Sequence, residues 1–93
     1  MKLYFRNRYL GLITQIEGDQ PWMCGNLCLS PTGAQFGEFF HWMVNEDNSL
    51  SDPPFDESLL DESNWLLEDE SGRRRGITLP AVHDDGVIAW RWR

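Results

Sequence analysis

Residues 2–17 of the chain read KLYFRNRYLGLITQIE, two runs of alternating apolar and polar residues separated by a short polar connection. A period of two is typical of strands that bury one face. Asn7-Arg8 suits a tight connection, because asparagine tolerates a positive φ. The sequence therefore predicts a β-hairpin over residues 2–17. One apolar face of its second strand is expected to consist of Leu10, Leu12 and Ile16.

The segment after the hairpin carries signals for a break and then for a helix. Pro21 has no backbone N–H, so we expect residues 22–29 to be irregular or a short edge strand. Ser30 can cap a helix, and Pro31 suits the first helical position. Apolar residues then recur at helical spacing, which predicts one amphipathic helix ending near Asn45. The apolar face of this helix consists of Phe36, Phe39, Phe40, Met43 and Val44.

The second half of the chain is predicted to be a long acidic loop followed by strands. Residues 46–63 are polar and contain Pro53-Pro54, which favours a loop with a helical turn across residues 57–62. Strand candidates follow at residues 65–69, 76–82 and 87–92. All segments together predict one α+β domain over residues 1–93. Its antiparallel sheet would have about five strands (the hairpin and a three-stranded meander), with one main helix packed on one face.

The charge of the chain is strongly acidic. Its 93 residues include 8 Lys and Arg and 15 Asp and Glu, a formal net charge of −7. Because such a charge repels phosphate backbones, we expect no nucleic-acid partner. No apolar run is long enough to span a membrane, and no signal-peptide core follows the N-terminus. We therefore expect a cytoplasmic protein that does not bind membranes.

The charged residues are unevenly placed along the chain. Ten acids fall in one block that contains no Lys or Arg: Glu46, Asp47, Asp52, Asp56, Glu57, Asp61, Glu62, Glu68, Asp69 and Glu70. Arg73-Arg74-Arg75 follows this block directly. We expect the triplet to decorate a hairpin turn and to pair with Glu68, Asp69 or Glu70 across it.

No catalytic or cofactor motif stands out from background. Cys24 and Cys28 are expected to be free thiols in a cytoplasmic protein. His41 and His83 lie 42 positions apart, unlike the short spacing of zinc-binding pairs. We therefore expect no metal, no cofactor and no enzymatic activity. The alternative is a small enzyme or ligand-binding domain that uses Cys24, His41 and His83.

One segment suggests a family. The run DQPWMCG at residues 19–25, after LYF at residues 3–5, resembles a D-x-P-W-x-x-G segment of a group of small bacterial proteins of unknown activity. In that group the segment follows an N-terminal hairpin and precedes a helix, and the chain ends in tryptophan-containing strands, like VIAWR at residues 87–91. The resemblance implies a bacterial α+β domain and assigns no activity or site residues.

The sequence favours a non-enzymatic acidic module that binds protein, of an accessory, inhibitor or immunity type. The acidic loop at residues 46–62 would steer a basic partner, and an apolar anchor such as Trp22 would supply affinity. A homo-oligomer that completes a small core is a further alternative. The candidate partner-binding residues are Trp22, Asp52, Asp56, Glu57, Asp61 and Glu62.

Overall fold

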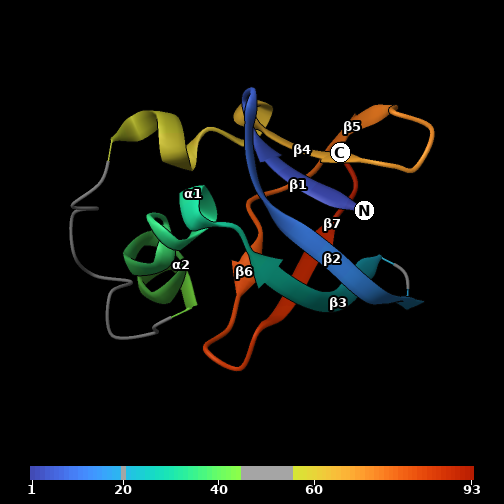
Figure 1. The fold of residues 1–93 in the computed structure, drawn as a ribbon, viewed down its shortest axis with the longest axis horizontal. Helices are drawn as coiled ribbons and strands as arrows, with labels where there is room; N and C mark the ends of the chain where they lie inside the picture. The colour runs from blue at the N-terminus through green and yellow to red at the C-terminus, as the bar shows by residue number, and fades with distance from the viewer. Residues whose placement is uncertain (20, 45–55) are drawn as a thin grey trace.

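In the computed structural model, which describes residues 1–19, 21–44 and 56–93, seven antiparallel strands form one curled sheet (Figure 1). The strands are β1 (Lys2–Phe5), β2 (Arg8–Asp19), β3 (Trp22–Leu29), β4 (Trp65–Glu68), β5 (Arg74–Gly76), β6 (Ala81–Val82) and β7 (Val87–Arg91). Their order across the sheet is β5-β4-β1-β2-β3-β7-β6. The helical elements are α1 (Pro31–Ala34), α2 (Gly37–Val44) and the 3₁₀ turns η2 (Glu57–Leu60) and η3 (Glu62–Asn64).

The predicted N-terminal hairpin is confirmed, but its apolar face is not the expected one. Phe5 pairs with Arg8, so the two turn residues are Arg6 and Asn7. The β1–β2 register shifts at Leu3/Tyr4, and Leu12 is consequently 42% exposed. An extra residue in one strand reverses the side-chain alternation beyond it, which a strict period of two does not anticipate. The buried side chains of β2 are Leu10 and Ile13.

The expectation for residues 22–29 was wrong, because they form an eight-residue strand inside the sheet. β3 pairs with β2 on one side and β7 on the other. Its Gly25 lies so close to β2 that an added Cβ would come within 2.8 Å of the Ile13 Cγ2. Because β3 contains a glycine and polar residues at outward positions, its sequence lacks the alternating apolar pattern of a strand. The strand is defined only by its pairing on both edges.

The predicted fold class was also wrong. The chain is mostly sheet, a seven-stranded curled half-barrel with α2 as its one real helix among the described residues, rather than five strands with a main helix on one face. The C-terminal strands do not form a meander, since β4 pairs with β1 and β7 pairs with β3. The strand predicted at residues 76–82 contains only the last residue of β5 and all of β6, which pair with β4 and β7. A bridge between Ile77 and Trp92 joins the two arms of the curl.

The predicted helix is likewise divided in two. Ser30 caps α1 by accepting a hydrogen bond from the Gly33 N–H, and Pro31 occupies the first turn, as expected. The helix breaks at residues 35–36, and α2 restarts at Gly37. Figure 1 shows α1 and α2 together at one end of the sheet, beside β6. The predicted end near Asn45 lies outside the described residues.

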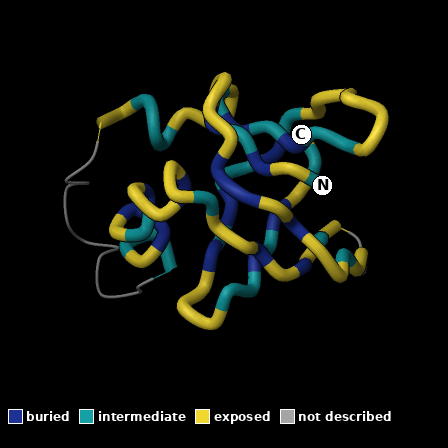
Figure 2. The backbone as a smooth tube through the Cα atoms, viewed as in Figure 1, coloured by how far each residue is buried: buried dark blue, intermediate teal, exposed yellow. Residues whose placement is uncertain are grey.

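The hydrophobic core fills the inside of the curl. Figure 2 shows buried backbone through the middle of the strands and exposed backbone at the hairpin turns. Aromatic rings close the end where the helices sit: Trp65 stacks on Phe39 with ring centroids 5.7 Å apart and also contacts Phe5, Phe36 and Phe40. Among the described residues, the core cluster consists of Leu3, Phe5, Leu10, Ile13, Leu27, Phe36, Phe39, Phe40, Trp65, Leu67, Ile77, Val82, Ile88 and Trp90.

Within the described ranges, no helix combines the length and the apolar character needed to cross a bilayer. The cytoplasmic location inferred from the sequence stays a prediction.

Candidate functional site

The predicted apolar anchor, Trp22, is the first residue of β3. It pairs with Arg91 of β7, and its side chain is about half exposed. The Arg91 guanidinium lies over the Trp22 ring at 5.6 Å, a cation–π contact. Trp22 therefore sits on the solvent face of the sheet, beside a cation.

The predicted acidic residues lie at the other end of β2. Asp56, Glu57, Asp61 and Glu62 are all exposed on η2 and η3, and we call these four side chains the η2–η3 acidic surface. The Asn64 carbonyl accepts a hydrogen bond from the Arg6 N–H, which places η3 next to the start of β2. Trp22 follows the far end of β2, about 36 Å of strand away. The structure thus separates Trp22 from the acids, and Asp52 lies outside the described residues.

Hydrogen bonds hold two of these acids in place. The Asp56 carboxylate accepts from the Ser58 N–H at 3.0 Å, and the Asp61 carboxylate accepts from both the N–H and the hydroxyl of Ser63. The turns are attached to the core through Trp65, whose indole N–H donates to the Leu59 carbonyl at 2.9 Å. The acidic surface therefore rests on fixed backbone.

The same hydrogen bonds predict an acid-dependent contribution to stability. The Ser63 hydroxyl, and then the Ser63 backbone N–H, lower the pKa of Asp61 below its ordinary value of 3.8. A carboxyl whose pKa falls on folding stabilises the fold above its unfolded pKa, and this contribution is lost as the pH drops through the folded pKa. We expect a ¹³C NMR titration to place the Asp61 midpoint below 3.8, and Ser63→Ala to raise it. The Asp69 midpoint, lowered by Ser71 and Arg73, should not move. A midpoint for Asp61 at or above 3.8 in the parent chain would contradict this.

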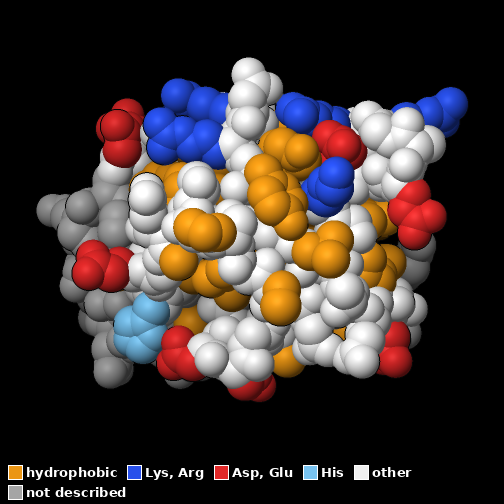
Figure 3. All heavy atoms as spheres, viewed as in Figure 1, with side chains coloured by type: hydrophobic (Ala, Val, Ile, Leu, Met, Phe, Trp, Pro, Cys, Tyr) orange, Lys and Arg blue, Asp and Glu red, His pale blue; other side chains and the backbone are white. Residues whose placement is uncertain are grey.

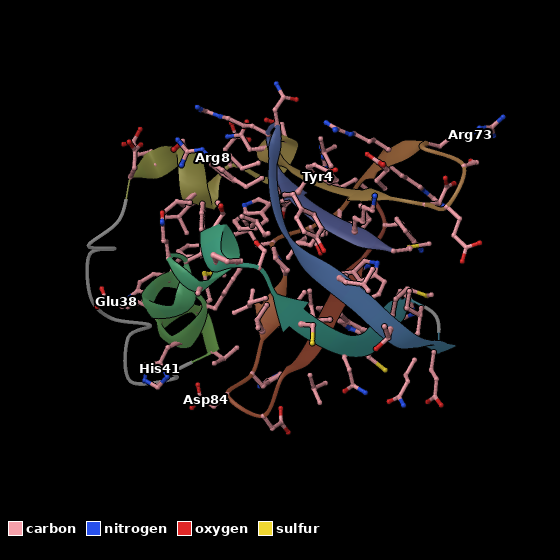
Figure 4. The ribbon with its side chains drawn as sticks, viewed as in Figure 1. Tyr4, Arg8, Glu38, His41, Arg73 and Asp84 are labelled. Atoms are coloured by element: carbon pink, nitrogen blue, oxygen red, sulfur yellow. The ribbon has the colours of Figure 1, made fainter. Side chains whose placement is uncertain are left out.

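The alternative trio of Cys24, His41 and His83 does not form one site. Both histidines line a hollow of about 220 Å³ between α2 and the β6–β7 turn, which Cys24 does not reach. His41 Nδ1 lies 3.1 Å from the Asp84 carboxylate, and Figure 4 shows the two side chains facing each other. Both side chains are largely exposed, and such surface pairs contribute about 0–1 kcal/mol. The pair connects α2 to the turn, and the geometry assigns it no further role.

The two cysteines lie too far apart to bond to each other. Cys24 and Cys28 are free, exposed and four residues apart on β3, which separates their Cα atoms by about 13 Å. A disulfide requires Cα atoms within about 7 Å. Among the described residues, no group of three or more His, Cys, Asp or Glu side chains gathers in a way that could hold a metal ion.

The arginine triplet follows the expectation in part. The Arg74 Nε donates to the Glu68 carboxylate at 3.0 Å, and the Arg74 guanidinium lies over the Tyr4 ring at 4.1 Å. Arg75 instead lies over the Trp92 ring, and the Asp69 carboxylate accepts from backbone N–H groups of its own turn. Figure 3 shows Lys and Arg side chains gathered along one edge of this face, over the β1–β2 turn and the β4–β5 hairpin.

A hollow of about 590 Å³ lies between the β1–β2 turn, the helices and η2. We call it the hairpin hollow. Its apolar lining is aromatic and aliphatic: Phe5, Phe36, Phe39 and Leu59. Arg6, Asn7 and Arg8 form the wall on the hairpin side, and Asp56 of the acidic surface lines the opposite side. Polar and charged side chains make up the larger part of the lining, so the hollow is more polar than a typical ligand pocket.

The sequence analysis missed this hollow. The sequence patterns place Arg8 in the hairpin connection, Arg6 in the first strand, and Phe36 and Phe39 on the apolar face of a helix. The sequence contains no signal for it. The structure adds that Arg6 has φ 56°, in a two-residue turn where glycine is the favoured residue at a left-handed position. Arg6 therefore occupies a turn position at which any side chain costs backbone energy that glycine would not.

No protein-family model, curated protein or solved structure matches this chain. The resemblance to small bacterial proteins therefore stays a prediction, and function must be argued from geometry alone.

Proposed function

We propose that the chain is a non-enzymatic protein-binding module that engages a basic partner through the η2–η3 acidic surface. The observation that carries the proposal is the set of four exposed carboxylates on two consecutive turns. None of the four forms an ion pair within the described part of the chain. Their charges are therefore available to a partner.

The local structure suits them to electrostatic steering. Because Asp56 and Asp61 cap their turns, and because Trp65 attaches the turns to the core, the carboxylates are presented without a large ordering cost on binding. The net charge of −7 adds a long-range attraction for cationic proteins. The distance along β2 removes Trp22 from this contact, so the apolar anchor inferred from the sequence is not part of the proposal.

Charge-matched variants test the proposal. In the first variant, Asp56→Asn, Glu57→Gln, Asp61→Asn and Glu62→Gln remove four charges, while the asparagines can still cap η2 and η3. The control variant, Glu17→Gln, Glu70→Gln, Asp84→Asn and Asp85→Asn, removes four charges elsewhere on the surface. Both variants have the same net charge, so a difference between them reports the position of the charges.

A basic protein captured from cell lysate at low salt by the parent chain should be released at high salt. With that protein purified, we expect the first variant to associate about tenfold more slowly at low salt, with little change in the dissociation rate. The association rate of the control variant should fall much less. Equal slowing in both variants, or retention of no basic protein by the parent chain, would reject the proposal.

A further inference from the structure

We propose that the hairpin hollow binds a small amphipathic monocarboxylate, a molecule with an apolar group of aromatic size and one carboxylate. This site goes beyond the protein-binding surface proposed above and does not depend on it. The volume of about 590 Å³ falls in the range of small-molecule sites. Leu59 of η2 and the accessible edge of the Phe36 ring would contact the apolar group.

The hairpin wall supplies the groups that recognise the carboxylate. Arg8 lines the hollow and forms no ion pair, side-chain hydrogen bond or ring contact with any described residue. The Arg6 guanidinium lies over the Phe5 ring, 5.5 Å from its centroid, and forms no ion pair within the described residues. Guanidinium groups donate in a planar fork that fits a carboxylate, and two of them lie in the same wall.

The acids that line the hollow limit which anions it accepts. One oxygen of Asp56 is already hydrogen-bonded to the Ser58 N–H. Glu38 lines the hollow from α2, and Figure 4 shows its side chain pointing away from Arg8. These two negative charges disfavour polyanions such as phosphate esters, since the repulsion rises with the charge of the ligand. A single carboxylate on the hairpin side can pair with Arg6 or Arg8 and meets less repulsion from Asp56 and Glu38 than a polyanion would.

The surrounding strands favour a small molecule over the end of a peptide. Peptides commonly bind by adding a strand to an exposed sheet edge. Both strands beside the hollow have their edges occupied, because β1 lies between β4 and β2, and β2 lies between β1 and β3. The free edges of the sheet belong to β5 and β6, and neither lines the hollow. A peptide in the hollow would therefore have no backbone partner on the sheet.

One substitution at Arg6 tests binding and stability together. The backbone of Arg6 is left-handed, with φ 56°, a conformation that favours glycine. Arg6→Gly should therefore raise the thermal midpoint of unfolding, by about 4 °C. We expect the same substitution to weaken carboxylate binding, so that stability and binding change in opposite directions.

The test uses 3-phenylpropanoate and its uncharged counterpart 3-phenylpropanamide, titrated into the ¹⁵N-labelled full chain. The acid should shift amide signals around residues 5–8 and 36–39, and the amide should bind at least tenfold more weakly. Arg8→Gln should weaken binding of the acid about tenfold. Arg75→Gln, which removes a cation that contacts Trp92 outside the hollow, should leave it unchanged.

Each other outcome overturns the proposal. Equal binding of acid and amide would show that the arginines do not recognise the carboxylate. Unchanged binding in Arg8→Gln, or no shifts near the hollow at millimolar acid, would remove the site. A peptide that ends in phenylalanine with a free carboxylate is the last probe. If it bound at least tenfold more tightly than 3-phenylpropanoate, the occupant would be a peptide terminus instead.

Discussion

Replacement of Trp65 by alanine is expected to lower the free energy of unfolding by about 3–5 kcal/mol. Trp65 is fully buried, and its ring contacts four phenylalanines of the aromatic end of the core. Its indole N–H also holds η2 through the Leu59 carbonyl. The substitution therefore removes a large apolar side chain, leaves a cavity and leaves a carbonyl without its donor. For a domain whose stability lies near the lower end of the usual range of about 5–15 kcal/mol, such a loss approaches complete unfolding.

Trp22→Ala is the matched control, because it removes the same side chain from an exposed position. We expect that variant to change stability by about 0.5 kcal/mol or less. Urea unfolding followed by circular dichroism measures both variants without relying on tryptophan fluorescence. If Trp65→Ala does not fold, Trp65→Phe should still show a smaller loss, from the missing hydrogen bond and the smaller ring. Similar costs at positions 22 and 65 would contradict the assignment of the core.

Gly33→Ala is expected to be the second most damaging substitution, at about 2–3 kcal/mol. A Cβ on Gly33 would lie 1.8 Å from the Leu10 carbonyl oxygen, far inside any allowed contact. The clash is with backbone, which cannot rotate away. The Ser30 N–H also donates to the Leu10 carbonyl, at 2.8 Å, so α1 is fixed to β2 at this point. The added methyl group must therefore displace α1 or bend β2.

Gly37→Ala, in the neighbouring helix α2, is expected to have the opposite effect on stability. An added Cβ at Gly37 meets nothing within 4 Å, and alanine favours helical geometry. We expect no loss of stability and a gain of up to about 1 kcal/mol. Thermal unfolding of the two variants side by side separates the close approach of α1 and β2 from a general effect of glycine. A loss at position 37 as large as at position 33 would count against the packing described.

Local patterns predicted the elements whose signals are contained in a few neighbouring residues. The alternation in residues 2–17 identified the first hairpin, and Ser30 with Pro31 identified the start of a helix. The strand at residues 65–69 and the strand at residues 87–92 were both found within one residue. Each signal depends on side-chain periodicity or on a cap that forms within the segment itself.

Long-range pairing decided the elements that the patterns missed. β3 has no alternating apolar pattern of its own and is a strand because β2 and β7 hydrogen-bond to it from both sides. Leu12 is exposed because the register with β1 shifts, which cannot be read from β2 alone. The order of the C-terminal strands depends on which side of the hairpin each one joins.

The same division applies to the candidate sites. The sequence alone predicted an acidic, partly helical segment, and part of that segment forms the η2–η3 acidic surface. The sequence also contains no recognisable catalytic motif. Only the tertiary structure separated Trp22 from that surface and placed Arg6 and Arg8 beside Phe36 and Phe39. Charge and periodicity are properties of adjacent residues. A hollow between a hairpin turn, a helix and a 3₁₀ turn exists only when strands distant in the chain pair and bring those elements together.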